Sequence, residues 1–145
     1  IANAGLFAFL ITRAGVPEAL GAWLTEVLKS PVWFLLGVNA ALFVIGMFIE
    51  TSAAIIVLAP ILVPVVTRLG IDPVHFGLVM MTCVTLGGMT PPVGVAMFTV
   101  CGMLKCPMDE YAKEALPLIG AVIVLVVLMI FVPDIVLLLP RLAFR

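Results

Sequence analysis

The sequence predicts an all-α, polytopic membrane protein. Of its 145 residues, 65% are hydrophobic and 10% are charged, and the mean hydropathy is +1.39. A soluble domain is typically about half apolar and about a quarter charged, so a core of this size could not bury so much apolar surface and the surroundings must be lipid. Short polar or proline-bearing segments interrupt the apolar runs, which predicts helices that break at membrane depth. The chain has no basic stripe of the kind that binds nucleic acid.

The first two elements are predicted to be the end of a membrane span and a surface helix. Residues 1–12 are an apolar run with no initial Met and no signal pattern, so we expect the chain to be the C-terminal part of a longer protein. Residues 16–29 place apolar side chains at helical spacing between charged ones, which predicts an interfacial helix. Trp23 and Trp33 suit the headgroup level.

Residues 31–69 are predicted to form a re-entrant hairpin. Pro31 follows a capping serine and begins the first half, and the polar tip Glu50–Ser52 separates it from the second half. Each half holds about 15 apolar residues, fewer than the ~20 that a full crossing needs. The tip also lacks the Lys or Arg expected of a loop in water. The alternative is two short spans joined by a polar turn.

The rest of the chain is predicted to hold a broken span, a second surface helix and a closing span. Residues 72–104 begin with Asp72-Pro73, a cap followed by proline, and are interrupted in the middle by a Pro-Pro pair. Residues 108–115 are polar and are expected to form an interfacial helix. Residues 117–139 are expected to form the last span.

The proline pair predicts unpaired backbone oxygens inside the membrane. Proline has no N–H to donate to the carbonyl four residues earlier, so Pro91 should free the carbonyl of Gly87 and Pro92 that of Gly88. Glycine side chains would not shield those oxygens. The alternative is a simple kink whose carbonyls are satisfied by neighbouring helices and water.

We expect these oxygens to bind sodium. Thr90 precedes a proline and should leave helical geometry, Met89 lies beside it, and Gly94 permits further unwinding. Hard cations take oxygen ligands, and secondary transporters place them at broken helices. The predicted sodium ligands are Gly87, Gly88 and Thr90.

The hairpin tip is predicted to supply the complementary half of the site. Thr51 or Ser52 would cap the returning helix, whose N-terminal N–H groups would attract the carboxylate of an anionic solute. Gly46 would allow a close backbone approach. Glu50, an acid between apolar runs, is either functional or a structural acid that holds the shape of the tip. Asn39 could serve the packing or the site.

Enzyme chemistry has no support in the sequence. The single histidine, His75, is expected at the interfacial start of a helix, with a proton relay as the alternative, and the three cysteines show no metal-ligand spacing. Neither a nucleophile-base dyad nor a pair of aspartates lies within the spans. We therefore expect no enzymatic activity and no cofactor apart from Na⁺ as a coupling ion.

Four motifs, in this order and spacing, resemble the large membrane (permease) subunit of tripartite ATP-independent periplasmic (TRAP) transporters. The motifs are Gly46–Thr51, Pro60–Pro64, Gly70–Gly77 and Gly88–Gly94. The resemblance covers essentially the whole chain and places it in the C-terminal half of that subunit.

The resemblance implies the elevator fold of the ion-transporter superfamily, with this chain as the second inverted repeat. It implies sodium-coupled uptake of an organic acid, such as a C4-dicarboxylate or a sugar acid such as sialic acid, across a bacterial inner membrane. A small four-helix membrane subunit and a periplasmic binding protein would be partners. The implied sodium and substrate positions are the hairpin tip, residues 46–52, and the broken helix, residues 87–94. The alternatives are a related carboxylate permease that works without a binding protein, and a pore or structural subunit.

Overall fold

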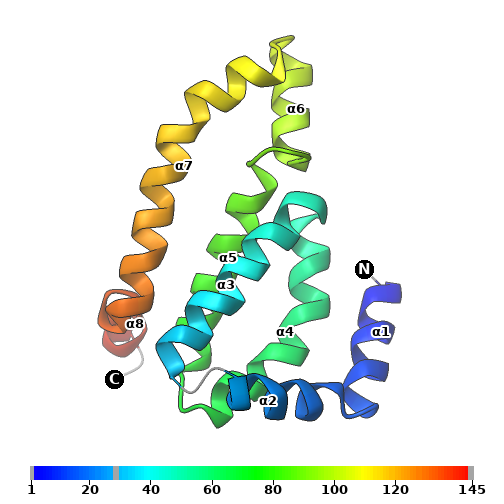
Figure 1. Cartoon of the computed structure of the whole chain (residues 1–145), viewed down its shortest axis with the longest axis vertical. Helices are drawn as coiled ribbons and strands as arrows, with labels where there is room; N and C mark the ends of the chain where they lie inside the picture. The colour runs from blue at the N-terminus through cyan, green and yellow to red at the C-terminus, as the bar shows by residue number, and fades with distance from the viewer. Residues whose placement is uncertain (1, 28–29, 144–145) are drawn as a thin grey trace.

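The computed structural model describes residues 2–27 and 30–143, and every regular element within them is an α-helix. The helices, in chain order, are α1 (Ala2–Arg13), α2 (Val16–Val27), α3 (Pro31–Phe48), α4 (Thr51–Arg68), α5 (Pro73–Gly88), α6 (Val95–Leu104), α7 (Met108–Phe131) and α8 (Pro133–Ala143). Figure 1 shows α3 and α4 as the two arms of a hairpin beside α5, with α7 running the length of the molecule.

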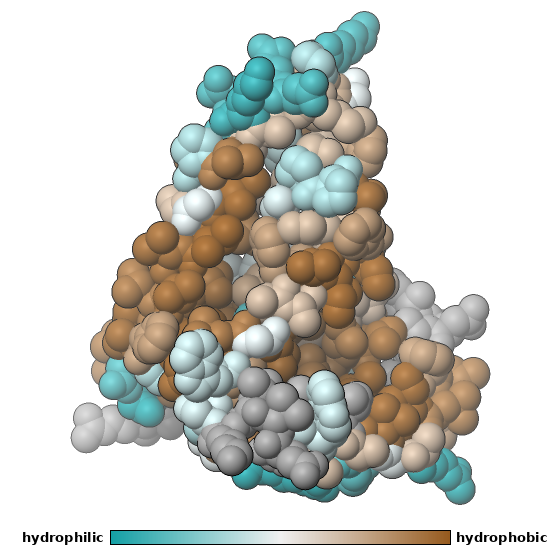
Figure 2. Space-filling view, in the orientation of Figure 1, coloured by the Kyte–Doolittle hydropathy of each residue, from teal (hydrophilic) through white to brown (hydrophobic). Residues whose placement is uncertain are grey.

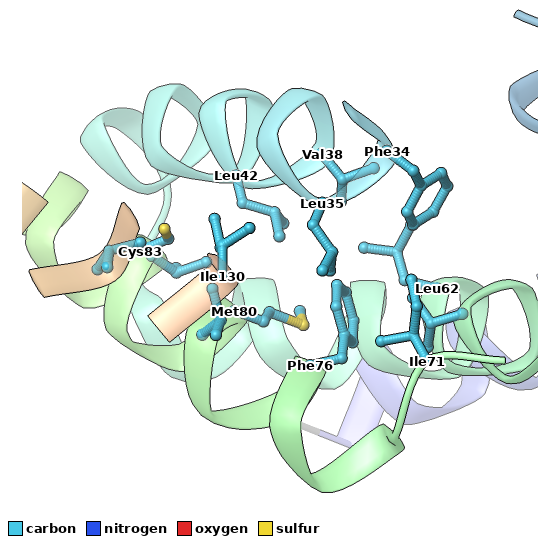
Figure 3. Close-up of a cluster of buried hydrophobic side chains, with 14 of the residues drawn as sticks. Phe34, Leu35, Val38, Leu42, Leu62, Ile71, Phe76, Met80, Cys83 and Ile130 are labelled. Atoms are coloured by element: carbon cyan, nitrogen blue, oxygen red, sulfur yellow. The ribbon is translucent and has the colours of Figure 1, made fainter. Parts of the chain in front are cut away.

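The core lies where the hairpin arms pack on α5. Each arm contacts α5 far more extensively than it contacts the other arm. Phe34 of α3 and Phe76 of α5 are fully buried in this core. In Figure 3 the buried side chains of α3 point toward those of α5, with Leu62 of α4 closing one end. The two arms of the hairpin therefore pack mainly on α5 and contact each other little.

Three helices are long and apolar enough to cross a membrane among the described residues: α3, α4 and α7. The α5 and α6 helices are shorter, with 16 and 10 residues, and follow one another across a non-helical break. Large apolar side chains remain exposed along the molecule, including Trp33, Met103 and Leu118 at 66%, 78% and 71%. Figure 2 shows apolar side chains over the middle of one face and polar ones at its two ends, the pattern of a multi-pass membrane protein.

The two polar ends are built differently. At one end α2 lies across the base of the hairpin, where Arg68 and Glu18 approach to 3.7 Å. The start of α5 and the whole of α8 lie at this end as well, while the turn between α6 and α7 lies at the other (Figure 1). The α2 helix occupies most of the predicted surface segment 16–29, of which residues 28 and 29 lie outside the described residues.

The C-terminal boundaries differ from those predicted. The surface helix 108–115 and the first part of the span 117–139 form one continuous helix, α7, which passes through Pro117. The carbonyl that this proline leaves without a donor belongs to Lys113, which is exposed at the polar end. The chain breaks instead at Val132, whose φ of −124° and ψ of 78° are not helical, because Pro133 follows it.

His75 joins α5 to α7. Its ring Nε2 lies 2.7 Å from the carbonyl oxygen of Met129, the oxygen that Pro133 leaves without an N–H four residues on. The side chain is 2% exposed, so His75, near the start of α5 at the polar end, is a buried link between the two helices.

Candidate functional site

Glu50 caps the second arm of the hairpin. Its carboxylate accepts hydrogen bonds from the backbone N–H groups of Ser52 and Ala53, at 2.9 and 3.0 Å, and from the Ser52 hydroxyl at 2.9 Å. The prediction that Thr51 or Ser52 caps this helix is therefore wrong, because the longer acidic side chain reaches both N–H groups first. Both N–H groups are therefore already hydrogen-bonded to Glu50 and are not free to bind the carboxylate of a solute.

The tip and the broken helix meet at two glycines. Gly46 near the end of α3 and Gly87 near the end of α5 are both buried. A Cβ added to Gly46 would collide with the carbonyl of Val84, and one added to Gly87 would collide with that of Phe43. The two backbones are thus in direct contact, as the prediction of a close approach at Gly46 required. Only glycine at both positions permits this crossing.

A backbone hydrogen bond connects the tip to the connection between α5 and α6. The N–H of Gly94 donates to the carbonyl oxygen of Met47 at 2.9 Å. Thr51 of the tip faces the end of α5 as well, because its hydroxyl oxygen lies 3.7 Å from where a Cβ on Gly88 would sit. In Figure 1 the turn between α3 and α4 accordingly lies beside the α5–α6 connection. The two sequence motifs therefore lie side by side.

The break itself is more ordered than predicted. The N–H of Thr90 donates to the carbonyl of Gly87 at 2.9 Å, and the Thr90 hydroxyl donates to the carbonyl of Leu86 at 2.7 Å. The expectation that Pro91 would free the Gly87 carbonyl is therefore wrong, because a tighter turn supplies an N–H from one residue earlier. The carbonyl of Gly88 has no such donor at the two prolines that follow it.

Two carbonyl oxygens converge on Gly94. A Cβ on that residue would lie 2.8 Å from the Thr90 oxygen and 3.1 Å from the Gly88 oxygen. Gly94 has φ 46° and ψ 86° and caps the start of α6. A side chain here would be strained and would cover both oxygens, so glycine keeps this cluster of oxygens open.

Tyr111 reaches the break from α7. Its hydroxyl donates to the carbonyl of Met89 at 3.3 Å. Tyr111 was not among the predicted site residues. The only signal for Tyr111 was its position as the single tyrosine, in a polar segment at a span end. Met47 lies within the predicted tip, residues 46–52, but no side-chain pattern pointed to its backbone carbonyl.

The remaining predicted residues line the same region. Pro92, Met89 and Ser52 are exposed, and Pro91 and Thr90 are half-buried. Among the described residues no three of the His, Cys, Asp and Glu side chains group as a metal centre would require. The available ligands are neutral oxygens beside one carboxylate. Such a set suits a hard monovalent or divalent cation and does not suit a transition metal.

Comparison with known proteins gives the family. The family model of the tripartite ATP-independent periplasmic transporter, DctM component, matches residues 1–135. The chain is 39% identical over 141 residues to the C4-dicarboxylate TRAP transporter large permease protein DctM of Pseudomonas aeruginosa, covering 97% of this chain and 33% of that one. It is 34% identical to the sialic acid TRAP transporter large permease protein SiaM of Vibrio cholerae, covering 94% and 32%. It is 29% identical to the 2,3-diketo-L-gulonate TRAP transporter large permease protein YiaN of Escherichia coli, covering 95% and 32%.

Fold and site together define an all-α, multi-pass membrane protein with a helix broken beside a hairpin tip. The chain belongs to the DctM family, the large permease component of tripartite ATP-independent periplasmic transporters. The resemblance noted in the sequence is thereby confirmed, as is the expectation that the protein is a transporter component and not an enzyme. The chain spans about a third of the length of the curated relatives it matches.

Proposed function

We propose that this chain forms one half of the ion and substrate site of a sodium-coupled organic-acid transporter. The observation that carries the proposal is the hydrogen bond from Gly94 to Met47, which joins the hairpin tip to the break in the α5–α6 span. A polar turn and carbonyl groups without N–H partners are costly in hydrocarbon. We therefore propose that these groups bind an ion and a solute.

In this proposal sodium lies at the Gly88–Gly94 turn. Its ligands are the carbonyl oxygens of Gly88 and Thr90, which converge on Gly94, and the hydroxyl oxygen of Thr90. That hydroxyl uses its proton on the Leu86 carbonyl, which leaves its lone pairs for a cation. The Gly87 carbonyl, already bonded to an N–H, is a weaker ligand than the sequence suggested.

The solute is an organic acid, as the names of several relatives indicate for those proteins. Glu50 occupies the first N–H groups of α4, so the solute carboxylate does not bind there. The negative charge of Glu50 favours a cation near the tip. The bound sodium ion then attracts the carboxylate of the solute.

The same placement supports part of the architecture that the family resemblance implies for the whole transporter. The tip of the α3–α4 hairpin lies beside the break, not beyond the end of the α5–α6 span (Figure 1), which favours a re-entrant hairpin over two full crossings. This half would be the second inverted repeat of an elevator fold in the bacterial inner membrane. A small four-helix membrane subunit and a periplasmic binding protein would complete the system.

Uptake by the complete permease tests the proposal. The permease and its small subunit are reconstituted in proteoliposomes with the binding protein and a labelled C4-dicarboxylate, sialic acid or diketogulonate outside. Accumulation that needs both an inward sodium gradient and the binding protein supports it. Accumulation without the binding protein would favour the related permease class, and accumulation that ignores sodium would contradict the ion site.

A further inference from the structure

Tyr111 hydrogen-bonds the peptide unit that lies between the two carbonyls assigned to sodium. Its hydroxyl donates to the carbonyl oxygen of Met89 at 3.3 Å. The N–H of the same peptide unit belongs to Thr90 and donates to the carbonyl of Gly87 at 2.9 Å. The unit is trans, and the C=O and N–H of a trans peptide point in opposite directions. The two hydrogen bonds therefore hold one planar group from both sides.

The peptide units on either side of this group carry the converging oxygens. The Gly88 carbonyl belongs to the unit before it and the Thr90 carbonyl to the unit after it. These oxygens lie 3.1 and 2.8 Å from where a Cβ on Gly94 would sit. Each unit is planar and is joined to the next only through the backbone angles of one residue. The orientation of the middle unit therefore limits where the two outer oxygens can point.

The Met89 carbonyl depends on Tyr111 for its hydrogen bond. Pro92, three residues on, has no N–H, and within the part of the chain that the structure describes only the Tyr111 hydroxyl donates to this oxygen. An unpaired carbonyl at membrane depth is costly. Without the hydroxyl, the middle peptide unit would be released on one side and could rotate toward another partner.

The turn after α6 brings Tyr111 to the break. Lys105 has φ 53° and ψ 34°, in the left-handed region, and reverses the chain at the end of α6. The backbone N–H of Tyr111 donates to the carbonyl of Pro107 at 3.3 Å, so this residue belongs to the first turn of α7. Its side chain is half-buried, and α7 packs on both α5 and α6. The hydroxyl is thus positioned by the helix that contacts both halves of the broken span.

We propose that Tyr111 is a positioning residue for the sodium site. By holding the peptide unit between Met89 and Thr90, it keeps the carbonyl oxygens on either side directed at one point. Tyr111 does not bind the ion and acts only through the backbone of the break. The inference rests on the proposed sodium site at this turn.

The sodium dependence of uptake by the complete transporter in proteoliposomes tests the inference. Tyr111→Phe keeps the aromatic ring and removes the hydroxyl. The sodium concentration for half-maximal uptake should rise about three- to tenfold, the change expected from the loss of one neutral hydrogen bond. The solute concentration for half-maximal uptake at saturating sodium should change little, because the solute does not contact this peptide unit.

Two further variants separate positioning from a general effect of losing a hydroxyl. Site-specific replacement of Tyr111 by 4-aminophenylalanine keeps a hydrogen-bond donor at the same place and should restore most of the sodium dependence of the parent. Thr67→Val is the matched control, because the Thr67 hydroxyl donates to a carbonyl of its own helix, that of Val63, at 2.8 Å. It should leave the sodium dependence of uptake unchanged.

The thermal midpoint of the purified permease gives a second readout that needs no transport. Each protein is unfolded in sodium chloride and in choline chloride, and the midpoint rises in sodium by an amount that depends on the affinity for the ion. This rise should be smaller for Tyr111→Phe than for the parent. An equal rise in both proteins would overturn the positioning role, and so would parent-like sodium dependence of uptake in Tyr111→Phe or a defect that 4-aminophenylalanine does not reduce. A parent that responds to sodium in neither assay would instead contradict the proposed sodium site itself.

Discussion

The backbone nitrogen of Gly94 lies 2.9 Å from the carbonyl oxygen of Met47, so the residue that precedes α6 is hydrogen-bonded to the hairpin tip. The bond joins two backbone groups and involves no side-chain atom. Movement of the tip would pull directly on the turn that carries the Gly88 and Thr90 oxygens. An ion held at that turn would in the same way resist movement of the tip.

The glycine crossing behind this bond should not tolerate a methyl group. Gly46→Ala and Gly87→Ala each place a Cβ against a carbonyl oxygen of the other helix, and overpacking of this kind costs about 1–3 kcal/mol or more. We expect a lower thermal midpoint for the purified permease and reduced uptake. Gly77→Ala is the control, because a Cβ there meets no atom within 4 Å. Equal midpoints for Gly46→Ala and Gly77→Ala would contradict the crossing.

Glu50 is predicted to act mainly through its shape. The carboxylate accepts from the N–H groups of Ser52 and Ala53 with its two different oxygens, so Glu50→Gln keeps an acceptor for one of them, whereas Glu50→Ala removes the cap. The alanine variant should therefore have the lower thermal midpoint. The glutamine variant should have a midpoint between those of the alanine variant and the parent, and should need more sodium for half-maximal uptake, because it removes a nearby negative charge. Identical midpoints for the two variants would show that Glu50 is not a cap in the membrane.

The link between His75 and Met129 predicts a stability defect without a transport signature. His75→Phe should destabilise the permease by about 1–3 kcal/mol, because the Met129 carbonyl loses its donor. His75→Gln, which keeps an N–H donor, should recover part of the loss. Thermal unfolding measures both, and the sodium dependence of uptake should stay unchanged. A change in sodium dependence would give His75 a role in transport that this geometry does not contain.

Thr90 is predicted to affect sodium more than the solute. Thr90→Ala removes one neutral oxygen, and the sodium concentration for half-maximal uptake should rise about tenfold, equivalent to about 1.4 kcal/mol. The solute affinity at saturating sodium should change little. Thr90→Ser keeps the hydroxyl and is the control. If sodium dependence is the same in all three proteins, Thr90 does not bind the ion.

Sequence patterns predicted the elements of this fold better than their bonding. The hairpin, the break and the surface helix could be predicted because each is determined by a short sequence pattern: a polar tip, a Pro-Pro pair and apolar residues at helical spacing. The single helix through Pro117 was missed, because a proline near a wet helix end is tolerated and sequence alone does not give depth. The Glu50 cap was missed because three adjacent side chains could serve, and only geometry selects among them. The Gly94–Met47 bond joins two backbone atoms, so no side chain in the sequence indicates it.

Sodium-driven uptake by the Pro91→Ala, Pro92→Ala double variant of the full permease tests the central claim most directly. Two restored N–H groups would let helix α5 continue past Gly88, and alanine is favoured over proline within a helix by about 3 kcal/mol per residue. The claim predicts a variant that assembles and unfolds at or above the parent's midpoint, but that no longer accumulates solute in response to sodium, while Pro117→Ala, outside the site, transports normally. Parent-like sodium-driven uptake by the double variant would show that the break is only a kink and that the ion lies elsewhere.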